Sequence, residues 1–264
     1  MSKTSLDQRL QVATRAARLG AAQALPRFDA RHELTVVSKG AQDRVTEVDR
    51  QVEETLRRAI RERFPEDAIL GEEEGLSTAS DGAETLWVID PIDGTDCFVF
   101  GLPMWSISIA FMEAGEVVLG VVYDPVHDEL FAAARDGGAT LNGRPIRVSE
   151  ATDLGAGLVG IGHSSRVSPE PTLAALDRLL AKGGLFHRCG SGALSLAWVA
   201  AGRLLGYHEA HINSWDCLAG LLLVREAGGW HSDFLAGDGL MAGNPLTAAC
   251  HGLIDEMRAL AGDG

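Results

Sequence analysis

The fold is decided by the stretch Trp87-Val88-Ile89-Asp90-Pro91-Ile92-Asp93-Gly94-Thr95. An apolar strand is expected to lead directly into Asp90, and Asp93 follows at a sharp turn. Carboxylates are the ligands that hard cations such as Mg²⁺ prefer. An aspartate held at the end of a rigid strand is placed well enough to bridge two ions about 3.5–4 Å apart. An isolated Asp-x-x-Asp-Gly turn is more often an ordinary polar turn, so other segments must decide.

The turn itself offers further groups suited to a metal and a phosphate. Pro91 stiffens the backbone, which leaves the carbonyl of Ile92 free to point inward as a ligand. Gly94 permits a positive φ and a close approach of a phosphate to the backbone. If Thr95 opens a helical turn, the free N–H groups there also attract anions. We therefore expect metal and phosphate binding at the same turn.

Two distant acidic segments support this interpretation. Glu72 belongs to Gly71-Glu72-Glu73-Glu74-Gly75, which follows another apolar strand, and Asp216 falls in the first turn of an apolar helix. Three consecutive acids are usually a solvated loop, and an aspartate at a helix start is usually a cap. Carboxylates at two strand ends and at one helix start are a less common combination, so a shared metal site is predicted.

The composition excludes several kinds of partner. The chain has 264 residues and a net charge of −14, which would repel nucleic-acid phosphates and anionic membranes. Four scattered cysteines form neither a zinc signature nor a disulfide framework, so we expect a reduced, cytoplasmic setting. The N-terminus lacks the pattern of a signal peptide, and no apolar run approaches the ~20 residues of a membrane span.

Hydrophobic periodicity predicts helices and strands in a layered α and β arrangement. One helix is expected over residues 5–25, ended by Pro26, and a second from Thr46 to Pro65. Apolar segments predict strands over 68–70, 86–89, 104–111, 117–123 and 130–134. After about residue 150, a strand over 158–161 alternates with helices over 171–180, 193–201 and 215–227.

This change of pattern suggests two halves of one compact catalytic unit. Residues 1–150 would form an N-terminal α+β half that carries most metal ligands. Residues 151–264 would form a C-terminal α/β half with Asp216 and the residues on the substrate side. No Pro/Ser-rich linker separates them.

The acidic motifs resemble those of the inositol monophosphatase family, within the lithium-sensitive, magnesium-dependent phosphatase superfamily. The resemblance covers about residues 39 to 229 in the family's order. It is carried by Gly71-Glu72-Glu73, by 90–95, by Trp215-Asp216, by 45–49 and, more weakly, by 190–193. The resemblance implies a layered α-β-α-β-α sandwich of the sugar-phosphatase type with mixed sheets. It also implies two or three Mg²⁺ ions per site, inhibition by lithium and a homodimer.

The family pattern assigns the metal ligands. Glu72, Asp90 and the carbonyl of Ile92 would hold one metal, whereas Asp90, Asp93 and Asp216 would hold the second. A third, weaker metal would share Glu72 and bind mostly water.

The same pattern assigns the catalytic groups. Thr95 and Glu72 would orient a metal-activated water for in-line attack on phosphorus, and no covalent protein nucleophile is required. Asp49 and Glu73 would act through water. The resemblance places the substrate against eight residues: Asp93, Gly94, Thr95, Gly190, Ser191, Gly192, Glu209 and Asp216.

Three positions depart from the family pattern and leave the substrate open. Asn213 stands where inositol phosphatases often have histidine, and Cys97 and Phe100 differ near the mouth of the site. The expected reaction is Mg²⁺-dependent hydrolysis of a small phosphate monoester that resembles inositol 1-phosphate. Histidinol phosphate is the main alternative.

Fructose 1,6-bisphosphate ranks lower, because no obvious basic cluster awaits a second phosphate. Arg166, Arg188 and Arg203 could contact a phosphate, although surface salt bridges are the more common role of such residues. His208 and His211 are interpreted as structural residues. A protein-binding regulatory role is the alternative to catalysis, since some bacterial relatives of the family act as partners in transcription.

Overall fold

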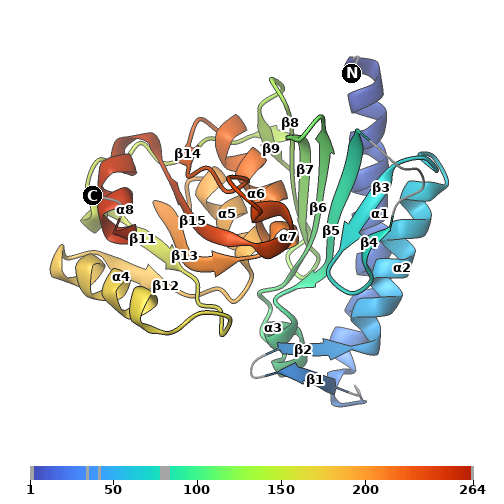
Figure 1. Ribbon diagram of the computed structural model, residues 1–264, viewed down its shortest axis with the longest axis horizontal. Helices are drawn as coiled ribbons and strands as arrows, with labels where there is room; N and C mark the ends of the chain where they lie inside the picture. Colours follow the sequence, from blue (N-terminus) through green and yellow to red (C-terminus); the bar gives the residue numbers. More distant parts are fainter. Residues whose placement is uncertain (1–2, 34–35, 41–42, 78–83, 263–264) are drawn as a thin grey trace.

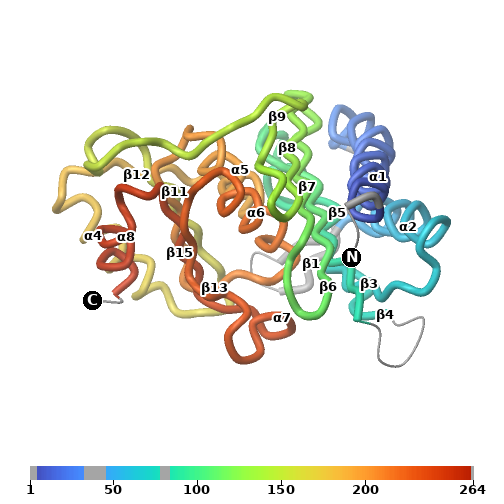
Figure 2. The backbone as a smooth tube through the Cα atoms, turned by 90° about the horizontal axis from the view of Figure 1, so that it is seen from above, coloured from blue at the N-terminus to red at the C-terminus, as the bar shows by residue number. Residues whose placement is uncertain are grey.

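The computed structural model describes residues 3–33, 36–40, 43–77 and 84–262 and forms five alternating layers (Figures 1 and 2). A helix pair, a large sheet, a second helix pair, a small sheet and a third helix pair follow one another, as the resemblance implied. The helices of these layers are α1 (Lys3–Asp29) and α2 (Glu47–Arg61), α5 (Gly192–Ala200) and α6 (Ser214–Glu226), and α4 (Glu170–Ala181) and α8 (Ile254–Ala261).

Within the described residues, the large sheet has eight strands in the order β10-β9-β8-β7-β6-β5-β3-β4. Only β3 and β5 run parallel, and every other neighbouring pair is antiparallel. These strands are β3 (Ala68–Gly71), β4 (Gly75–Ser77), β5 (Thr85–Asp93), β6 (Ser106–Glu113), β7 (Glu116–Asp124), β8 (Glu129–Ala134), β9 (Ala139–Leu141) and β10 (Arg144–Pro145). A separate hairpin joins β1 (Val36–Gly40) to β2 (Asp43–Thr46).

The small sheet has five strands among the described residues, in the order β12-β11-β13-β15-β14. The first three are parallel, so their carboxyl ends lie at one edge of the sheet. The strands are β11 (Leu158–Ile161), β12 (Leu185–His187), β13 (Gly206–Ile212), β14 (Trp230–His231) and β15 (Asn244–Ala249). Two short helices complete the elements used below: α3 (Thr95–Phe100) and α7 (Gly239–Ala242).

The first helix does not end at Pro26 as predicted, because tertiary packing stabilises one more turn. Helix α1 continues to Asp29, and the amide of Ala30 donates to the carbonyl of Pro26 over 3.1 Å. Phe28 in this turn is buried, with its ring centroid 5.5 Å from that of Phe98 and 5.7 Å from that of Trp105. Burial of an aromatic side chain offsets the hydrogen bond that proline cannot make.

The second helix begins as predicted. The hydroxyl of Thr46 accepts from the amide of Val48, and the carboxylate of Asp49 accepts from the Thr46 amide. This capping box satisfies two amides that the first turn leaves without an intrahelical partner.

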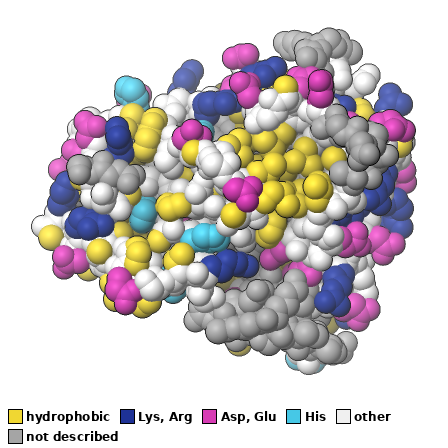
Figure 3. Space-filling view, viewed as in Figure 1, with side chains coloured by type: hydrophobic (Ala, Val, Ile, Leu, Met, Phe, Trp, Pro, Cys, Tyr) yellow, Lys and Arg dark blue, Asp and Glu magenta, His cyan; other side chains and the backbone are white. Residues whose placement is uncertain are grey.

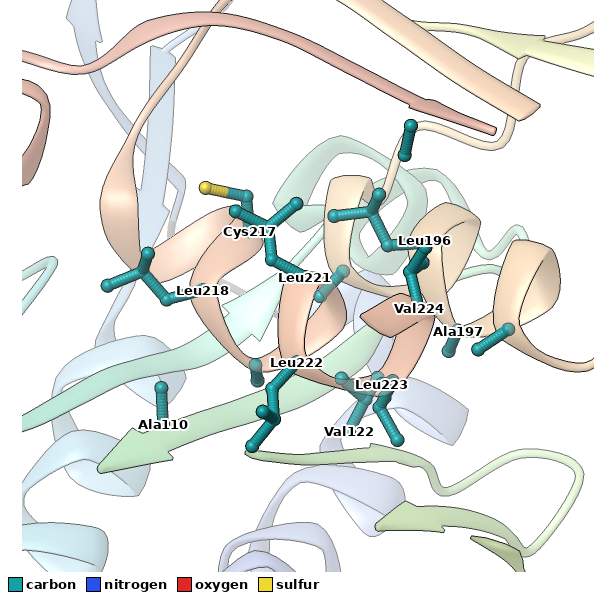
Figure 4. Packing of buried hydrophobic residues seen from close by; sticks show 14 of the residues in the cluster. Ala110, Val122, Leu196, Ala197, Cys217, Leu218, Leu221, Leu222, Leu223 and Val224 are labelled. Carbon is teal, nitrogen blue, oxygen red and sulfur yellow. The ribbon is translucent and has the colours of Figure 1, made fainter. Parts of the chain in front are cut away.

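Helices α5 and α6 form the core between the sheets. Figure 4 shows Leu222 and Leu223 of α6 facing the strands of the large sheet, and Leu196 of α5 beside the same helix. Helix and sheet touch through their main chains at one point: a Cβ on Gly120 of β7 would lie 2.5 Å from the carbonyl oxygen of Ala219. Any side chain larger than hydrogen at Gly120 would displace the helix.

On one face of the molecule, acidic side chains are spread among basic ones. On the face seen in Figure 3, acidic and basic side chains alternate around the periphery, and hydrophobic side chains gather near the middle. Among the described residues, no helix is both long enough and apolar enough to cross a membrane.

Candidate active site

Three carboxylates from distant parts of the chain converge beside the carboxyl end of β5. Asp90 and Asp93 come from that strand and Asp216 from the first turn of α6; one oxygen of each lies within 4.8 Å of the others. Side chains three residues apart would normally lie on opposite faces of a strand. Asp90 pairs with Ser108 and Asp93 with Ser106, so β5 contains one extra residue. This bulge turns both aspartates to the same side.

The second half of the chain fixes the carboxylate of Asp93. The hydroxyl of Ser191 donates to Oδ2 over 2.5 Å, and the amides of Ala193 and Gly192 donate over 2.8 and 3.2 Å. These groups belong to the first turn of α5, whose positive end favours an anion. The contact therefore orients a metal-ligand candidate and joins the two sheets.

The other two carboxylates are held by local backbone. Oδ2 of Asp216 accepts from the amide and the side chain of Asn213, each over 3.2 Å, which caps α6. Oδ1 of Asp90 accepts from the amide of Ile92 over 2.9 Å. The side chains of Asp90 and Asp216 also share a hydrogen bond with each other.

The cluster concentrates negative charge, and the charge of the exposed Arg166 lowers the pKa of Asp216. Burial raises the pKa of all three carboxyls; the neighbouring negative charges raise the pKa of Asp90 and Asp93 further, and that of Asp93 reaches about 7. Within the described part of the chain, none of the three forms an ion pair with Lys, Arg or His. Converging buried oxygens of this kind are the donor set that Mg²⁺ requires, and the residues fit such an ion.

The threonine after the turn connects the cluster to Asp49. The hydroxyl of Thr95 is a hydrogen-bond donor to both Asp49 Oδ1, at 3.3 Å, and the carbonyl of Ile92, at 3.2 Å. Asp49 is completely buried and also accepts from the hydroxyl of Thr46 over 2.5 Å. The capping box of α2 therefore holds the group that positions Thr95.

The turn that carries Glu72 rests on a buried ion pair that sequence reasoning missed. Glu53 and Arg57 of α2 are both buried and lie 2.7 Å apart. The amides of Glu73 and Glu74 donate to the carboxylate of Glu53 over 2.8 and 3.0 Å. The signal was available, because Glu53 and Arg57 are four residues apart on the apolar face of a predicted helix.

A cleft of about 180 Å³ opens above the carboxylates. It is lined by eight of the candidate residues or their neighbours on the same segments: Glu72, Asp93, Gly94, Thr95, Gly190, Gly192, Glu209 and Asp216. Asp49, Asp90, Ile92 and Ser191 are buried below this lining. Glu73 lies beside Arg50, with 3.9 Å between its Oε2 and the Arg50 Nε.

The sequence matches one known protein family over most of its length. The family model described as "Inositol monophosphatase family" matches residues 5–261. The chain belongs to the inositol monophosphatase family. Nus factor SuhB of Pasteurella multocida is 38% identical over 255 residues, which cover 96% of this chain and 95% of that protein.

Two further relatives are similar to this chain over most of its length. Inositol-1-monophosphatase of Rhizobium meliloti is 41% identical over 217 residues, 81% of this chain and 79% of that protein. The crystal structure of the extragenic suppressor protein suhB from Bartonella henselae superposes with a TM-score of 0.91 at 31% identity, covering 97% of this chain and 99% of that one.

On the substrate side of this inositol monophosphatase fold, Glu209 of β13 is buried and faces the cleft. The hydroxyl of Tyr207 donates to its Oε2 over 2.5 Å. Burial, together with the charges of Asp216 and Asp93, raises the pKa of Glu209 to about 8. A carboxyl group in this state can donate to a substrate oxygen as well as accept from a hydroxyl.

The three departures from the family pattern have different surroundings. Asn213 caps α6 through Asp216, as described above. The thiol of Cys97 donates to the carbonyl of Cys189 over 3.3 Å, and burial raises its pKa to about 11. Phe100 has 64% of its surface exposed at the end of α3.

Four basic side chains line the cleft: His163, Arg166, Arg188 and His211. A phosphate contact was the less favoured prediction for the two arginines, and no place in the cleft was predicted for the two histidines. His208 is buried instead, with Nδ1 3.0 Å from the hydroxyl of Thr247, which agrees with a structural role. Spacing in the sequence gives no signal for this group. Folding brings it together because His163, Arg166 and Arg188 follow β11 and β12, and His211 lies near the end of β13, at one edge of the small sheet.

Proposed function

We propose that this protein hydrolyses small phosphate monoesters with Mg²⁺. The observation that carries the proposal is the convergence of Asp90, Asp93 and Asp216 without an ion-pair partner. Glu72, Asp90 and the carbonyl of Ile92 would hold one ion, and Asp90, Asp93 and Asp216 the other. Bound Mg²⁺ would neutralise phosphoryl oxygens and lower the pKa of the attacking water.

The protein groups then position the reactants. Thr95 donates its hydroxyl hydrogen toward Asp49, so its oxygen is left to accept a hydrogen bond from the attacking water, which Glu72 would orient from the opposite segment. Gly94 leaves room for the phosphate beside the backbone, because its φ of +96° excludes most side chains. Asp216 and Glu209 would bind hydroxyls of the alcohol.

The family pattern also leads us to propose a class of substrate and an oligomeric state. An ester that resembles inositol 1-phosphate is the first candidate and histidinol phosphate the second. Lithium sensitivity and a homodimer also follow from the family pattern. A cytoplasmic location is proposed from the scattered cysteines, and a division into the halves 1–150 and 151–264 from the change of sequence pattern near residue 150. The hydrogen bonds from Ser191 to Asp93 support a single catalytic unit, since each half contributes to one site.

Steady-state hydrolysis of a panel of esters tests this proposal. Inositol 1-phosphate, histidinol phosphate and fructose 1,6-bisphosphate would be compared with Mg²⁺ and with EDTA, using Asp93→Asn as the inactive control. We expect Mg²⁺-dependent turnover that the control lacks. Absence of turnover on every ester would reject the enzyme assignment.

A regulatory role is the second candidate, because one relative is named Nus factor SuhB. It predicts a protein partner that binds independently of the metal site. Affinity capture with the unaltered chain and with Asp90→Asn distinguishes the roles. A partner retained by both would support the second function, whereas loss of the partner in the variant would count against it.

A further inference from the structure

We propose that the site selects phosphate esters whose alcohol part carries a second anionic group, recognised by Arg166 and Arg188. This inference rests on the proposed phosphatase function and specifies its substrate class. It revises the expectation that no basic cluster awaits a second anion: the two arginines are 22 positions apart in the sequence but line the same cleft.

The topology places both arginines at the edge where ligands bind in parallel sheets. Strands β11 and β12 are parallel neighbours, with Gly160 beside His187. Arg188 follows β12 directly, and Arg166 lies in the loop after β11, so both project from the same edge of the sheet. Ligands of open α/β sheets bind outside these carboxyl ends.

The two guanidinium groups act on different parts of the cleft. Arg188 and Glu209 both line a smaller adjoining cavity that Arg166 does not line. A Cβ on Gly190 would lie 3.7 Å from a terminal nitrogen of Arg188, so this side chain extends over the lining of the cleft. The arginines therefore flank the space assigned to the alcohol.

Charge and geometry favour an anion at this place. The phosphoryl group is assigned to the carboxylate cluster and its ions, and hydroxyls of a neutral alcohol need only Glu209 and Asp216. Among the charged lining residues that neither requirement uses, the guanidinium groups of Arg166 and Arg188 outnumber the carboxylate of Asp96. Their planar donors match the oxygens of a carboxylate or a phosphate in bidentate fashion.

Matched ester pairs test the inference with Mg²⁺ present. Glycerol 2-phosphate and 2-phosphoglycerate differ at one carbon, which bears a hydroxyl in the first and a carboxylate in the second. Fructose 1-phosphate and fructose 1,6-bisphosphate make the same comparison for a second phosphate. The pair in which the more anionic ester is preferred shows whether the site recognises a carboxylate or a second phosphate. For the unaltered chain, we expect kcat/KM to be at least about 10-fold higher for the more anionic ester.

Variants then assign the preference to the arginines. We expect Arg166→Gln and Arg188→Gln each to lower kcat/KM for the more anionic ester by about 10-fold, as for a lost charge-assisted hydrogen bond. The neutral partner should lose clearly less, and the preference should weaken with added salt. Arg144→Gln, an exposed change in β10 outside the cleft, removes the same charge and should preserve the preference.

The outcomes separate this inference from the function on which it rests. If the esters with an uncharged alcohol part are hydrolysed and the more anionic ester is preferred in neither pair, the inference is overturned and the phosphatase assignment stays intact. Equal losses on both members of a pair in the variants would also overturn it, because the arginines would then serve the common phosphoryl group. No turnover of any ester would overturn both.

Discussion

Two sets of buried acids in this molecule differ in what surrounds them. Glu53 and Asp67, near the outer helices, each contact a guanidinium group: Glu53 that of Arg57, and Asp67 that of Arg9. Asp67 also accepts from the indole of Trp87 over 2.8 Å. Every charge in this set has a partner, and the result is a fixed turn and a fixed helix.

The carboxylates of the cleft have hydrogen-bond donors but, among the residues whose side chains the structure describes, no buried cation. Their repulsion opposes folding, since each ionised group raises the cost of ionising the next. A chain that keeps such a cluster forgoes stability at that place, which is typical of functional sites. The structural acids therefore differ from the candidate catalytic ones in having a counter-charge, and not in being buried.

Removal of one carboxylate from the cluster should have the largest effect and should act on activity alone. We expect Asp93→Asn and Asp216→Asn to lower Mg²⁺-supported kcat by about 1,000-fold or more, equivalent to about 4 kcal/mol. Thermal unfolding in EDTA should occur at an equal or higher temperature, because a repelling charge is gone. Full activity in both variants would refute the metal assignment.

Removal of one partner from the paired set should act on stability instead. Arg57→Met leaves Glu53 buried without its cation, which typically costs about 3–5 kcal/mol. Urea unfolding measures this loss. Arg58→Met, one position along on the exposed face of α2, should change the free energy of unfolding by less than about 0.5 kcal/mol. Equal losses of unfolding free energy in the two variants would contradict the conclusion that Glu53 depends on Arg57 as its counter-charge.

The pH dependence of stability should also differ between the sets. The folded-state pKa is about 7 for Asp93 and about 8 for Glu209, above the ordinary values of 3.8 and 4.5. The folded chain therefore binds these protons more tightly than the unfolded chain. Their contribution is complete below the ordinary values and is lost as the pH rises through about 7 and 8.

We expect the unfolding temperature in EDTA to fall by roughly 5 °C between about pH 6 and pH 9. Mg²⁺ should reduce this fall, because the ions take the place of the protons. An unfolding temperature that is constant over this range in EDTA would show that the carboxylates do not repel one another.

The smallest effect concerns the capping box that links α2 to the site. Thr46→Ala removes an acceptor for the Val48 amide and a donor to Asp49, which should cost about 1 kcal/mol. Chemical denaturation measures this, with the exposed Thr152→Ala as control. A fall in kcat at a temperature at which the variant is still fully folded would indicate that Asp49 positions Thr95.

Motifs near one another in the sequence were more predictable than contacts across the fold. The strand before Asp90, the start of α2 and the helix that carries Asp216 were recognised, because local periodicity and capping residues determine them. The sequence did not predict β13 (Gly206–Ile212), since His208 and Glu209 interrupt its apolar pattern. Their burial depends on partners such as Thr247 and Tyr207.

The site was predicted in part for the same reason. The resemblance supplied the positions of the acidic residues, but not what orients them: the bulge in β5, the contact of Ser191 with Asp93, and the ion pair under Glu72. The arginines of the cleft were also underestimated. A lone arginine in a sequence carries no sign of the loop it will face after folding.

The main-chain contact of Gly120 with Ala219 has a consequence for ion choice. Because α6 rests directly on β7, we expect Asp216 to keep its spacing from the β5 aspartates when an ion binds. Mg²⁺ requires oxygens at about 2.0–2.1 Å, whereas Ca²⁺ requires about 2.3–2.6 Å. We therefore expect Gly120, which lies outside the carboxylate cluster, to influence which ionic radius fits the site.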